Sequence, residues 1–365
     1  MSFQLQLPSS ELAKHLKLNI GVVAPRAILP ILGNVLIKAQ NGEITFTTTD
    51  SEVEVMTTII PPESDMLQQE TESITIPAKK LMDIAGSLDG DISITLDGDD
   101  AIIKGKRSKF KLQTLPALEF PDTPPITSEN HIKIEVGKLK EIFTNTLECT
   151  GNNDVRYYLN GVLLQLENNM MYIVGTDGHR MAYQKVELEC VDFKVIVPRK
   201  AIMEFGKLFS KGNVDVSMDD NHVKFNQDGT TLISKLIDGD FPDWQNVIPS
   251  AVERMMEVET AELVAALSRV SILSNEKYKG VQFNLTNNQL VISAKNSYQE
   301  TAREVLAVEY TGDEMEIGFN GVYLQAALKP LGKTCQLHLA DGNTSGLFMN
   351  PGDESLKMIV MPMRL

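Results

Sequence analysis

The run Thr176-Asp177-Gly178-His179-Arg180 brings a carboxylate, an imidazole and a guanidinium within five residues. Such a set could support acid/base or nucleophilic catalysis, because a carboxylate can orient an imidazole that moves a proton. Asp177-Gly178 also stands between two segments that predict strands, and this dipeptide is typical of a hairpin turn. The turn is the favoured interpretation, and a hydrolase that uses His179 and Asp177 is the alternative. The sequence contains no Gly-x-Ser-x-Gly elbow, phosphate-binding loop or dinucleotide fingerprint.

Metal-ligating residue types are present, but their spacing does not predict a metal site. Neither the histidines nor the cysteines show ligand spacing. They are His15, His131, His179, His222 and His338, and Cys149, Cys190 and Cys335. The odd number of scattered cysteines favours reduced thiols. Asp97, Asp99 and Asp100 lack the full calcium-loop pattern and are interpreted as a solvated turn. We therefore expect no metal and no cofactor.

Two further stretches could bind a partner. Residues 154–161 (Asp-Val-Arg-Tyr-Tyr-Leu-Asn-Gly) place an arginine and paired tyrosines before a strand. These side chains could contact nucleic acid or pack at the edge of the strand, and the residues alone leave both possibilities open. The C-terminal residues 358–365 (Met-Ile-Val-Met-Pro-Met-Arg-Leu) are unusually apolar for a chain end. A tail of this kind either completes a sheet or lines a groove for a partner peptide.

The elements that would position these residues recur along the chain. In 195–211 a short β-branched strand leads through Pro198, expected at a first helical position, into a helix with a buried stripe of Ile202, Phe205, Leu208 and Phe209. Similar strand-to-helix segments begin near Ile74 and Glu316, and their matching positions Pro77, Pro198 and Asn320 are offset by 121 and 122 residues. In the last one, Asn320 replaces proline as a capping residue.

A second marker has the same period, because Phe120-Pro121-Asp122 recurs as Phe241-Pro242-Asp243. A period near a third of the chain is the size of a domain rather than of a solenoid repeat. We therefore predict three copies of one domain, at 1–126, 127–249 and 250–365, with linkers at 121–130 and 242–253. Each copy is expected to be α+β, with two helices packed on antiparallel sheets.

The expected helices follow from apolar spacing, and the expected hairpins follow from turn residues. Residues 10–20, 78–88, 137–148, 199–211, 260–273 and 321–333 predict the six helices. Ser9-Ser10-Glu11 and Thr260-Ala261-Glu262 predict capped helix starts. Asn41-Gly42, residues 97–100, Asn287-Asn288 and Asp341-Gly342 predict hairpin turns.

The charge is unevenly distributed between these elements. The chain has a formal net charge of −15, which by itself counts against a nucleic-acid partner. The six expected helices nevertheless contain 13 Lys or Arg and six Asp or Glu. If the helices share one face, that face could hold a polyanion while the remaining surface repels it. The alternative is that helix surfaces carry lysine for solubility, and charge counting does not separate the two.

Targeting signals are not evident. No apolar run approaches the ~18 residues of a membrane-spanning helix. The first residues, Met-Ser-Phe-Gln-Leu, lack the basic start and long apolar centre of a signal peptide. We expect a cytoplasmic protein that does not bind a membrane.

Taken together and in order, several motifs resemble the bacterial sliding-clamp family, the beta subunit of DNA polymerase III. The resemblance covers essentially the full length. It rests on residues 29–34 (Leu-Pro-Ile-Leu-Gly-Asn), 154–161, 176–180, 197–200 (Val-Pro-Arg-Lys), 272–277 (Ile-Leu-Ser-Asn-Glu-Lys), 314–320 (Glu-Met-Glu-Ile-Gly-Phe-Asn) and 361–365.

The resemblance implies a non-enzymatic processivity factor. Two chains would form a closed head-to-tail ring in which three DNA-clamp domains per chain direct two helices each toward duplex DNA, bound without sequence preference. The implied partners are a second copy of the chain, the clamp loader, replicative and translesion DNA polymerases, and mismatch-repair and other proteins with clamp-binding linear motifs.

The resemblance also assigns residues to three surfaces. The DNA-facing set is Arg26, Lys79, Lys80, Asn153, Tyr157, Tyr158, Arg199 and Lys200. The partner-peptide groove is Arg156, Leu159, Thr176, Gly178, His179, Arg180, Met181, Pro242, Val247, Val360, Met361, Pro362, Met363 and Arg364. The dimer seam is Arg107, Lys109, Phe110, Ile272, Leu273, Glu300 and Glu304, with the two basic residues facing the two glutamates.

This sequence departs from the family pattern at three positions. Asn246 replaces an arginine that some relatives carry beside the groove, Met181 replaces leucine, and Arg303 is expected to interrupt an acidic seam. Besides the hydrolase, a structural protein that only assembles with itself is a third possibility, and it predicts no affinity for motif peptides.

Overall fold

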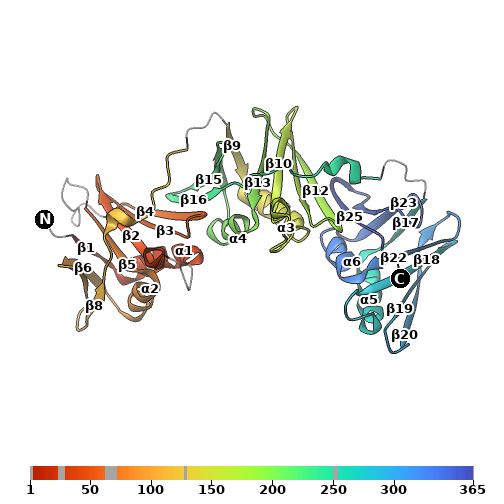
Figure 1. The fold of residues 1–365 in the computed structure, drawn as a ribbon, viewed down its shortest axis with the longest axis horizontal. Coiled ribbons are helices and arrows are strands. Elements are labelled where there is room, and N and C mark those ends of the chain that lie inside the picture. Colours follow the sequence, from red (N-terminus) through yellow and green to blue (C-terminus); the bar gives the residue numbers. More distant parts are fainter. Residues whose placement is uncertain (1–2, 24–28, 62–71, 127–129, 250–253, 365) are drawn as a thin grey trace. The chain divides into compact units, whose positions relative to one another are not determined.

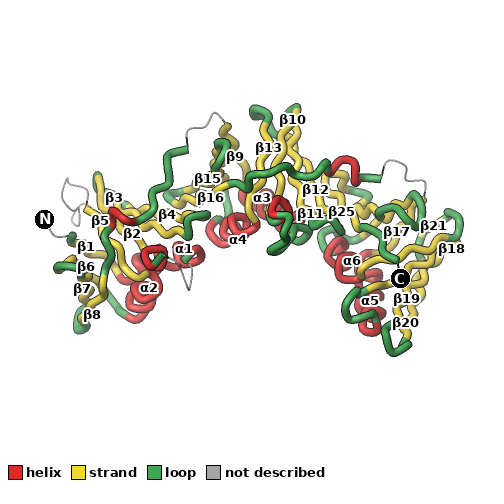
Figure 2. The backbone as a smooth tube through the Cα atoms, viewed as in Figure 1, coloured by secondary structure: helices red, strands yellow, loops and turns green. Residues whose placement is uncertain are grey.

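The computed structural model describes residues 3–23, 29–61, 72–126, 130–249 and 254–364 (Figure 1). The chain separates into two compact units, residues 1–140 with 200–236 and residues 141–199 with 237–365. Each unit contains two antiparallel sheets and helices packed on them (Figure 2). The prediction of an α+β fold is confirmed.

The first unit is built on a four-stranded and an eight-stranded sheet. The smaller sheet has the order β1 (Gln4–Pro8), β6 (Asp91–Asp97), β7 (Asp100–Lys104), β8 (Lys109–Gln113). The larger sheet has the order β5 (Glu72–Pro77), β2 (Asn34–Gln40), β3 (Glu43–Thr49), β4 (Val53–Ile59), β16 (Thr230–Lys235), β15 (His222–Gln227), β14 (Asn213–Met218), β9 (Asn130–Glu135).

Two helices of the first unit, α1 (Ser9–Asn19) and α2 (Ala78–Ser87), lie side by side on these sheets. Leu12 and Leu16 of α1 and Leu81 of α2 are at most 1% exposed, because they recur at helical spacing on the face toward the strands. They share one core with strand residues from both sheets, such as Ile94 and Phe46. The predicted apolar stripes of these helices are therefore the core of the first copy.

The second unit has a nine-stranded and a four-stranded sheet. The larger has the order β13 (Phe193–Pro198), β10 (Gly161–Glu167), β11 (Met170–Thr176), β12 (Arg180–Glu187), β25 (Asp353–Val360), β24 (Gly346–Asn350), β23 (Thr334–Leu339), β17 (Arg254–Glu259), β21 (Glu309–Tyr310). The smaller has the order β20 (Thr301–Ala307), β19 (Gln289–Lys295), β18 (Gly280–Thr286), β22 (Met315–Asn320).

Helices α5 (Thr260–Val270) and α6 (Gly321–Leu328) lie against each other in the second unit. Leu263, Leu267, Leu324 and Leu328 are fully buried in a core that also takes residues from both sheets. The remaining helices, α3 (Val136–Leu147) and α4 (Arg199–Leu208), belong to the middle copy. The first and last copies thus have the same plan, a core enclosed by two helices and two sheets.

The larger sheets join neighbouring copies of the repeat. Strand β4 of the first copy pairs with β16 of the middle copy, from Val53↔Ser234 to Thr57↔Thr230. Strand β12 of the middle copy pairs in the same antiparallel way with β25 of the last copy, from Arg180↔Val360 to Gln184↔Leu356. The two compact units therefore divide the middle copy, because each of its sheets continues into a different neighbour.

The expected turns and caps are partly confirmed. Asn41-Gly42 joins β2 to β3 with both residues at positive φ, as a hairpin turn of this type requires. Asn320 caps α6, since its side chain accepts hydrogen bonds from the backbone N–H groups of Val322 and Tyr323. Asp177-Gly178 joins β11 to β12, so the predicted hairpin is also confirmed.

Three predictions about helix starts are wrong. The side chains of Ser9 and Thr260 cap nothing, because both residues already lie inside the first turn, after Pro8 and Glu259. The Thr260 hydroxyl is buried without a hydrogen-bond partner among the described residues. Pro198 ends β13, paired with Gly161, and α4 begins one residue later. Proline therefore closes the strand ahead of the helix rather than occupying the first helical position.

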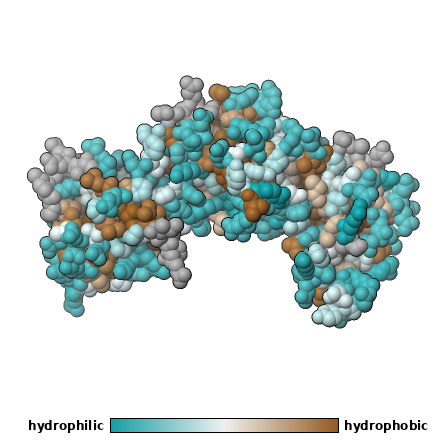
Figure 3. Space-filling model, in the orientation of Figure 1, coloured by the Kyte–Doolittle hydropathy of each residue, from teal (hydrophilic) through white to brown (hydrophobic). Residues whose placement is uncertain are grey.

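Hydrophilic residues cover most of the visible surface, and hydrophobic residues form separate small groups (Figure 3). Among the described residues, no helix is both long and apolar enough to cross a membrane. No group of three or more potential metal ligands occurs in that part of the chain.

Candidate functional site

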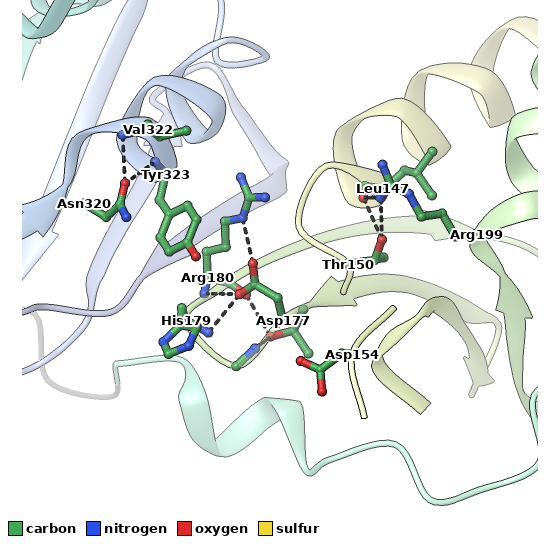
Figure 4. Close-up of polar contacts among 12 residues, drawn as sticks. Leu147, Thr150, Asp154, Asp177, His179, Arg180, Arg199, Asn320, Val322 and Tyr323 are labelled. Atoms are coloured by element: carbon green, nitrogen blue, oxygen red, sulfur yellow. Dashed lines mark hydrogen bonds and ion pairs between the residues drawn. The ribbon is translucent and has the colours of Figure 1, made fainter. Parts of the chain in front are cut away.

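The turn between β11 and β12 is a closed hydrogen-bond network (Figure 4). The Asp177 carboxylate accepts the backbone N–H groups of His179 (2.9 Å) and Arg180 (3.0 Å) and the Nε of Arg180 (3.0 Å). Thr176 donates its hydroxyl to the Arg180 carbonyl and accepts from the Gly178 N–H. Asp177 thus binds the backbone of His179 and not its imidazole. The hydrolase interpretation lacks its carboxylate–imidazole pair and is wrong.

A second network attaches the 154–161 segment to this turn. Arg156 makes a bidentate pair with Asp154, with Nε–Oδ1 at 3.0 Å and Nη2–Oδ2 at 2.8 Å, and Nη2 also donates to the Asp177 carbonyl. This pairing holds the pKa of Asp154 at about 2. Gly178 has a φ of +85°, and a Cβ there would lie 2.8 Å from the Arg156 guanidinium. A side chain at position 178 would therefore strain the turn and displace Arg156.

Two backbone hydrogen bonds hold the C-terminal tail, one at Met361 and one at Met363. The backbone N–H of Met361 donates to the His179 carbonyl, and that of Met363 donates to the Gly318 carbonyl. The tail therefore continues the β12–β25 junction and then follows the edge strand β22. This outcome matches the sheet-completing alternative, and it also presents Met361, Pro362 and Met363 half-buried beside the turn.

Tyr323 of α6 lies against the same turn (Figure 4). The Arg180 guanidinium carbon stands 4.6 Å from the centroid of the Tyr323 ring, and the His179 ring stacks on it at 6.3 Å. Burial raises the pKa of Tyr323, and the nearby Asp177 acts in the same direction. The phenol therefore stays neutral at physiological pH and serves as a flat wall.

The apolar side of this site is a cluster around Trp244, which stands in a short 3₁₀ turn (Trp244–Val247). Trp244 donates to the Gln165 side chain at 3.2 Å, and its ring lies 5.1 Å from that of Tyr183. Met181, 1% exposed, belongs to the same cluster, and Val247 packs against it half-buried. The site therefore combines an apolar floor with a rigid polar wall.

Most residues of the predicted groove come together in this region of the second unit. Leu159, Thr176, Met181 and Val360 are buried and shape the surface from below, whereas Gly178, His179, Pro242 and Arg364 are exposed. Asn246, one of the departures from the family, is held by the Asp243 carboxylate at 2.6 Å. The assignment of these residues to peptide binding stays a prediction.

The predicted DNA-facing cations differ in whether they already contact other residues of the chain. Lys79 and Lys80 are exposed in the first turn of α2, with no ion pair to another described residue. Arg199 donates instead to the Leu147 carbonyl and the Thr150 hydroxyl at the end of α3 (Figure 4). Lys200 pairs with Asp50, and this contact keeps the pKa of Asp50 low against the opposing effect of its burial. Arg26 lies outside the described residues.

The other three predicted DNA-facing residues lie on one loop. Asn153 has a φ of +58°, a conformation that asparagine tolerates better than most residues. Tyr157 is 58% exposed, and its ring meets that of Tyr158 edge to face at 5.8 Å. Tyr158 is half-buried against the Trp244 cluster, so it also has the packing role that the sequence left open.

Three of the predicted seam residues lie on two edge strands, whereas Arg107 and Glu300 precede these strands and Ile272 and Leu273 lie in a 3₁₀ turn (Ser271–Leu273). Lys109 and Phe110 lie on the edge strand β8, with Phe110 turned toward the core and Lys109 exposed. Glu304 lies on the edge strand β20, where Arg269 of α5 pairs with it. Ile272 is 77% exposed. Arg303 lies on the opposite face of β20 from Glu304, because side chains alternate along a strand. The expected interruption of an acidic seam by Arg303 stays a prediction.

The cysteines occupy sites that disfavour thiolate chemistry. Cys149 and Cys335 are buried, and their burial raises the pKa of each thiol to about 12. Neither of these two buried cysteines forms a disulfide.

Sequence reasoning missed two residues that shape the site. Tyr323 follows the capping residue Asn320 by three positions but lies more than 140 residues from the turn that it contacts. Trp244 stands in the segment predicted as a linker. The single tryptophan of the chain, in a stretch otherwise rich in proline and polar residues, was a usable signal of buried structure.

Comparison with known proteins identifies the class of this architecture. Family models of the N-terminal, central and C-terminal domains of the DNA polymerase III beta subunit match residues 1–124, 133–243 and 245–364. The beta sliding clamp of Pseudomonas putida is 39% identical over 375 residues, with both chains fully covered.

Solved structures agree with this class. The DNA polymerase III subunit beta of Pseudomonas aeruginosa superposes with a TM-score of 0.95 at 37% identity, with both chains fully covered. The Pseudomonas aeruginosa sliding clamp solved with griselimycin gives a TM-score of 0.93 at 36% identity, again over both full chains.

The fold is thus that of a sliding clamp, with three clamp domains of helices on antiparallel sheets. The chain belongs to the DNA polymerase III beta subunit family. Its function is that of a replication processivity factor without enzymatic activity.

Proposed function

We propose that two copies of this chain close head to tail into a ring around duplex DNA. The observation that carries the proposal is the repeated junction. In each copy, one sheet contains three consecutive antiparallel strands (β2–β3–β4, β10–β11–β12 or β18–β19–β20). At both internal junctions the third of these strands, β4 or β12, pairs antiparallel with the edge strand of the second sheet of the next copy, β16 or β25. Each chain has one remaining edge of each kind, β20 and β8.

Pairing β20 of one chain with β8 of another would repeat the internal junction a third time. A contact between two different surfaces generates a ring or an open filament, and a ring closes when the rotation per module allows it. Three modules in each of two chains would give six such junctions. The two edges are also complementary in charge, since Arg107 and Lys109 stand at β8 and Glu300 and Glu304 at β20.

The helices supply a surface suited to DNA. With the bounds given above, they contain ten Lys or Arg and five Asp or Glu, in a chain whose net charge is −15. Lys79 and Lys80 stand in the first turn of α2, and Arg199 and Lys200 in that of α4, without an acidic residue in either first turn. Cations there oppose the helix dipole, by about 0.3–1 kcal/mol each. Lys79 and Lys80 have no ion pair with another described residue to offset this cost, and we infer that they serve an external polyanion. Arg26, Asn153, Tyr157, Tyr158, Arg199 and Lys200 would complete the DNA-facing surface.

Contact with phosphates alone would be weak, salt-dependent and indifferent to sequence, which suits a protein that slides. Linkage of the closed ring with the DNA would then provide retention. Arg199 would act from a fixed position, because it already binds the end of α3.

We propose the apolar and polar site beside the C-terminal tail as the groove for linear motifs of other replication proteins. Its floor of Met181 and Val247 suits apolar side chains, and its wall of Arg180, His179 and Tyr323 suits a peptide backbone or an aromatic group. The occupants would be replicative and translesion polymerases, the clamp loader, and mismatch-repair and related proteins. The domain boundaries 1–126, 127–249 and 250–365 and a cytoplasmic location belong to the same proposal.

Removal of 361–365 tests the groove. We expect a peptide with the clamp-binding motif of the replicative polymerase to bind the full chain and not the trimmed chain, by fluorescence anisotropy. The dimer should survive in both, by analytical ultracentrifugation, because the tail is bound to β22, the edge of its sheet opposite to β20. Leu118→Ser, at a fully exposed position of the first unit, is the matched control. Unchanged peptide affinity of the trimmed chain would contradict the groove.

A further inference from the structure

A cavity of about 780 Å³ lies on the face of the β20–β19–β18–β22 sheet opposite to the helices. The surface is recessed there because three small residues share that face: Gly280 on β18, Ser293 on β19 and Thr301 on β20. The ladder places Ser293 opposite Gln282 on one side and Arg303 on the other, so long side chains stand around the small ones. Tyr278, 56% exposed, forms part of the rim.

The charge of this cavity is opposite to that of the chain. Three cations line it, Lys295, Arg303 and Arg364, and no carboxylate does. Two glutamates adjoin the lining, where Glu316 accepts a hydrogen bond from Gln282 and Glu300 accepts one from Asn296, so each carboxylate is bound to a neutral amide. Lys295, Arg303 and Arg364 are exposed and make no ion pair with another described residue. In a chain of net charge −15, this local excess selects an anionic ligand.

The cavity shares two tail residues with the proposed peptide groove. Met363 and Arg364 of the tail line it, while Met361 is bound to the His179 carbonyl in the groove. The hydrogen bond from the Met363 N–H to the Gly318 carbonyl fixes the tail along the edge of the same sheet. In Figure 1 the C-terminal end is drawn over this sheet, in agreement with the lining residues. A peptide that leaves the groove along the tail would reach the cavity within a few residues.

We propose that this cavity binds acidic side chains that flank the linear motif of a partner peptide seated in the groove. The inference rests on the proposed groove and adds a selectivity element to it. Partners with Asp or Glu on the flank that reaches Arg364 are retained longer than partners with a neutral flank. The motif itself supplies the apolar contacts in the groove, and the cations of the cavity determine the relative affinities of different partners.

Arg303 can make a directional contact with such a carboxylate. Alternation along β20 directs it to the cavity face, away from Glu304 and Arg269 on the helix face. A guanidinium can make a bidentate contact with a carboxylate, and Lys295 and Arg364 add charge without requiring one geometry.

The test compares three fluorescent peptides that share the clamp-binding motif of the replicative polymerase. One carries three serines on each flank, one carries three aspartates before the motif, and one carries three aspartates after it. We expect one of the two acidic peptides to bind the full chain about five- to tenfold more tightly than the serine peptide at low salt, with the gain lost near 0.5 M salt.

Variants locate the effect. In Lys295→Gln/Arg303→Gln the gain from the acidic flank should disappear, while the affinity of the serine peptide stays unchanged. Lys194→Gln, an exposed lysine on β13 outside the cavity, is the matched control and should keep the full gain. Arg303→Lys should keep part of it.

The outcomes separate the inference from the proposed function. Equal affinities of all three peptides for the full chain, or a gain that survives Lys295→Gln/Arg303→Gln, would overturn the cavity proposal and leave the groove intact. Failure of the serine peptide to bind at all would contradict the groove itself. If the double variant weakens retention on DNA and leaves every peptide affinity unchanged, the cavity binds phosphate and the proposal is wrong.

Discussion

The first and last copies of the clamp domain are built alike, but their free edges differ. In the first copy, edge strand β8 (Lys109–Gln113) has exposed lysines that alternate with Phe110 and Leu112 against the core. In the last copy, edge strand β20 (Thr301–Ala307) has Glu304 and Leu306 on its helix side, near the exposed Ile272. The middle copy has no such edge, because the pairings β4–β16 and β12–β25 occupy the corresponding edges of its two sheets.

This difference teaches that the repeat leaves one unfinished junction, divided between the two ends of the chain. An exposed edge strand is a template for pairing with another chain, and proteins usually protect it. Here the protection is charge of opposite sign at the two edges. Each edge therefore repels its own kind and attracts the other, which favours head-to-tail closure over aggregation.

The largest expected effect comes from the apolar part of the proposed junction. Ile272→Asp should raise the dimer dissociation constant by 100-fold or more. Burying an isoleucine stabilises by about 1.5–3 kcal/mol, and the residue would occur at both junctions of a two-chain ring. Sedimentation over a dilution series measures it. Val191→Asp, at another exposed apolar position of the second unit, should leave the dimer unchanged.

A smaller effect is expected from the charges at the two edges. Glu304→Lys should weaken the dimer about tenfold at low salt and less at high salt, since exposed pairs are screened. Mixing it with a chain that carries Arg107→Glu/Lys109→Glu should restore the junction between the two variants. Arg269 complicates this edge, because its pairing with Glu304 lowers the pKa of Glu304 and competes for its carboxylate. Arg269→Gln alone should therefore tighten the dimer or leave it unchanged.

The smallest expected effect is a change in how the stability of the first copy depends on pH. Burial lowers the pKa of His15 below 6.5, so the unfolded chain takes up this proton first, and stability is lost as pH falls through 6.5 toward the folded pKa. Burial raises the pKa of Glu54 above 4.5, so its contribution to stability is lost as pH rises rather than as pH falls. His15→Gln should reduce the drop in unfolding temperature between pH 7.5 and 5.5, and Glu54→Gln should not. An unchanged drop in His15→Gln would assign the acid sensitivity elsewhere.

Local features of this fold could be predicted from the sequence, because they depend on neighbouring residues. The apolar stripes of Leu12 and Leu16 or of Leu263 and Leu267 report helices, and Asn41-Gly42 reports a hairpin, without knowledge of the rest of the chain. The Asp177 turn was predictable for the same reason, since its carboxylate bonds to backbone groups two and three residues ahead.

Long-range pairings could not be predicted in this way. The register of β12 with β25 and the placement of Tyr323 beside Arg180 join segments more than 140 residues apart, and no periodicity encodes such a contact. In the sequence, Arg199 resembled a cation that is free to contact DNA, yet its guanidinium donates to the Leu147 carbonyl at the end of α3. Its second role depends on where α3 stops, which is the least predictable property of a helix.

The central claim is that closure of β8 on β20 links the protein topologically with DNA. The most direct measurement compares retention after loading on a circular duplex and on the same duplex cut once, by gel filtration at 0.2 M salt. We expect the protein to remain with the circle and to leave the linear form within minutes, and we expect Ile272→Asp to be lost from both. Equal retention on circular and linear DNA would contradict it.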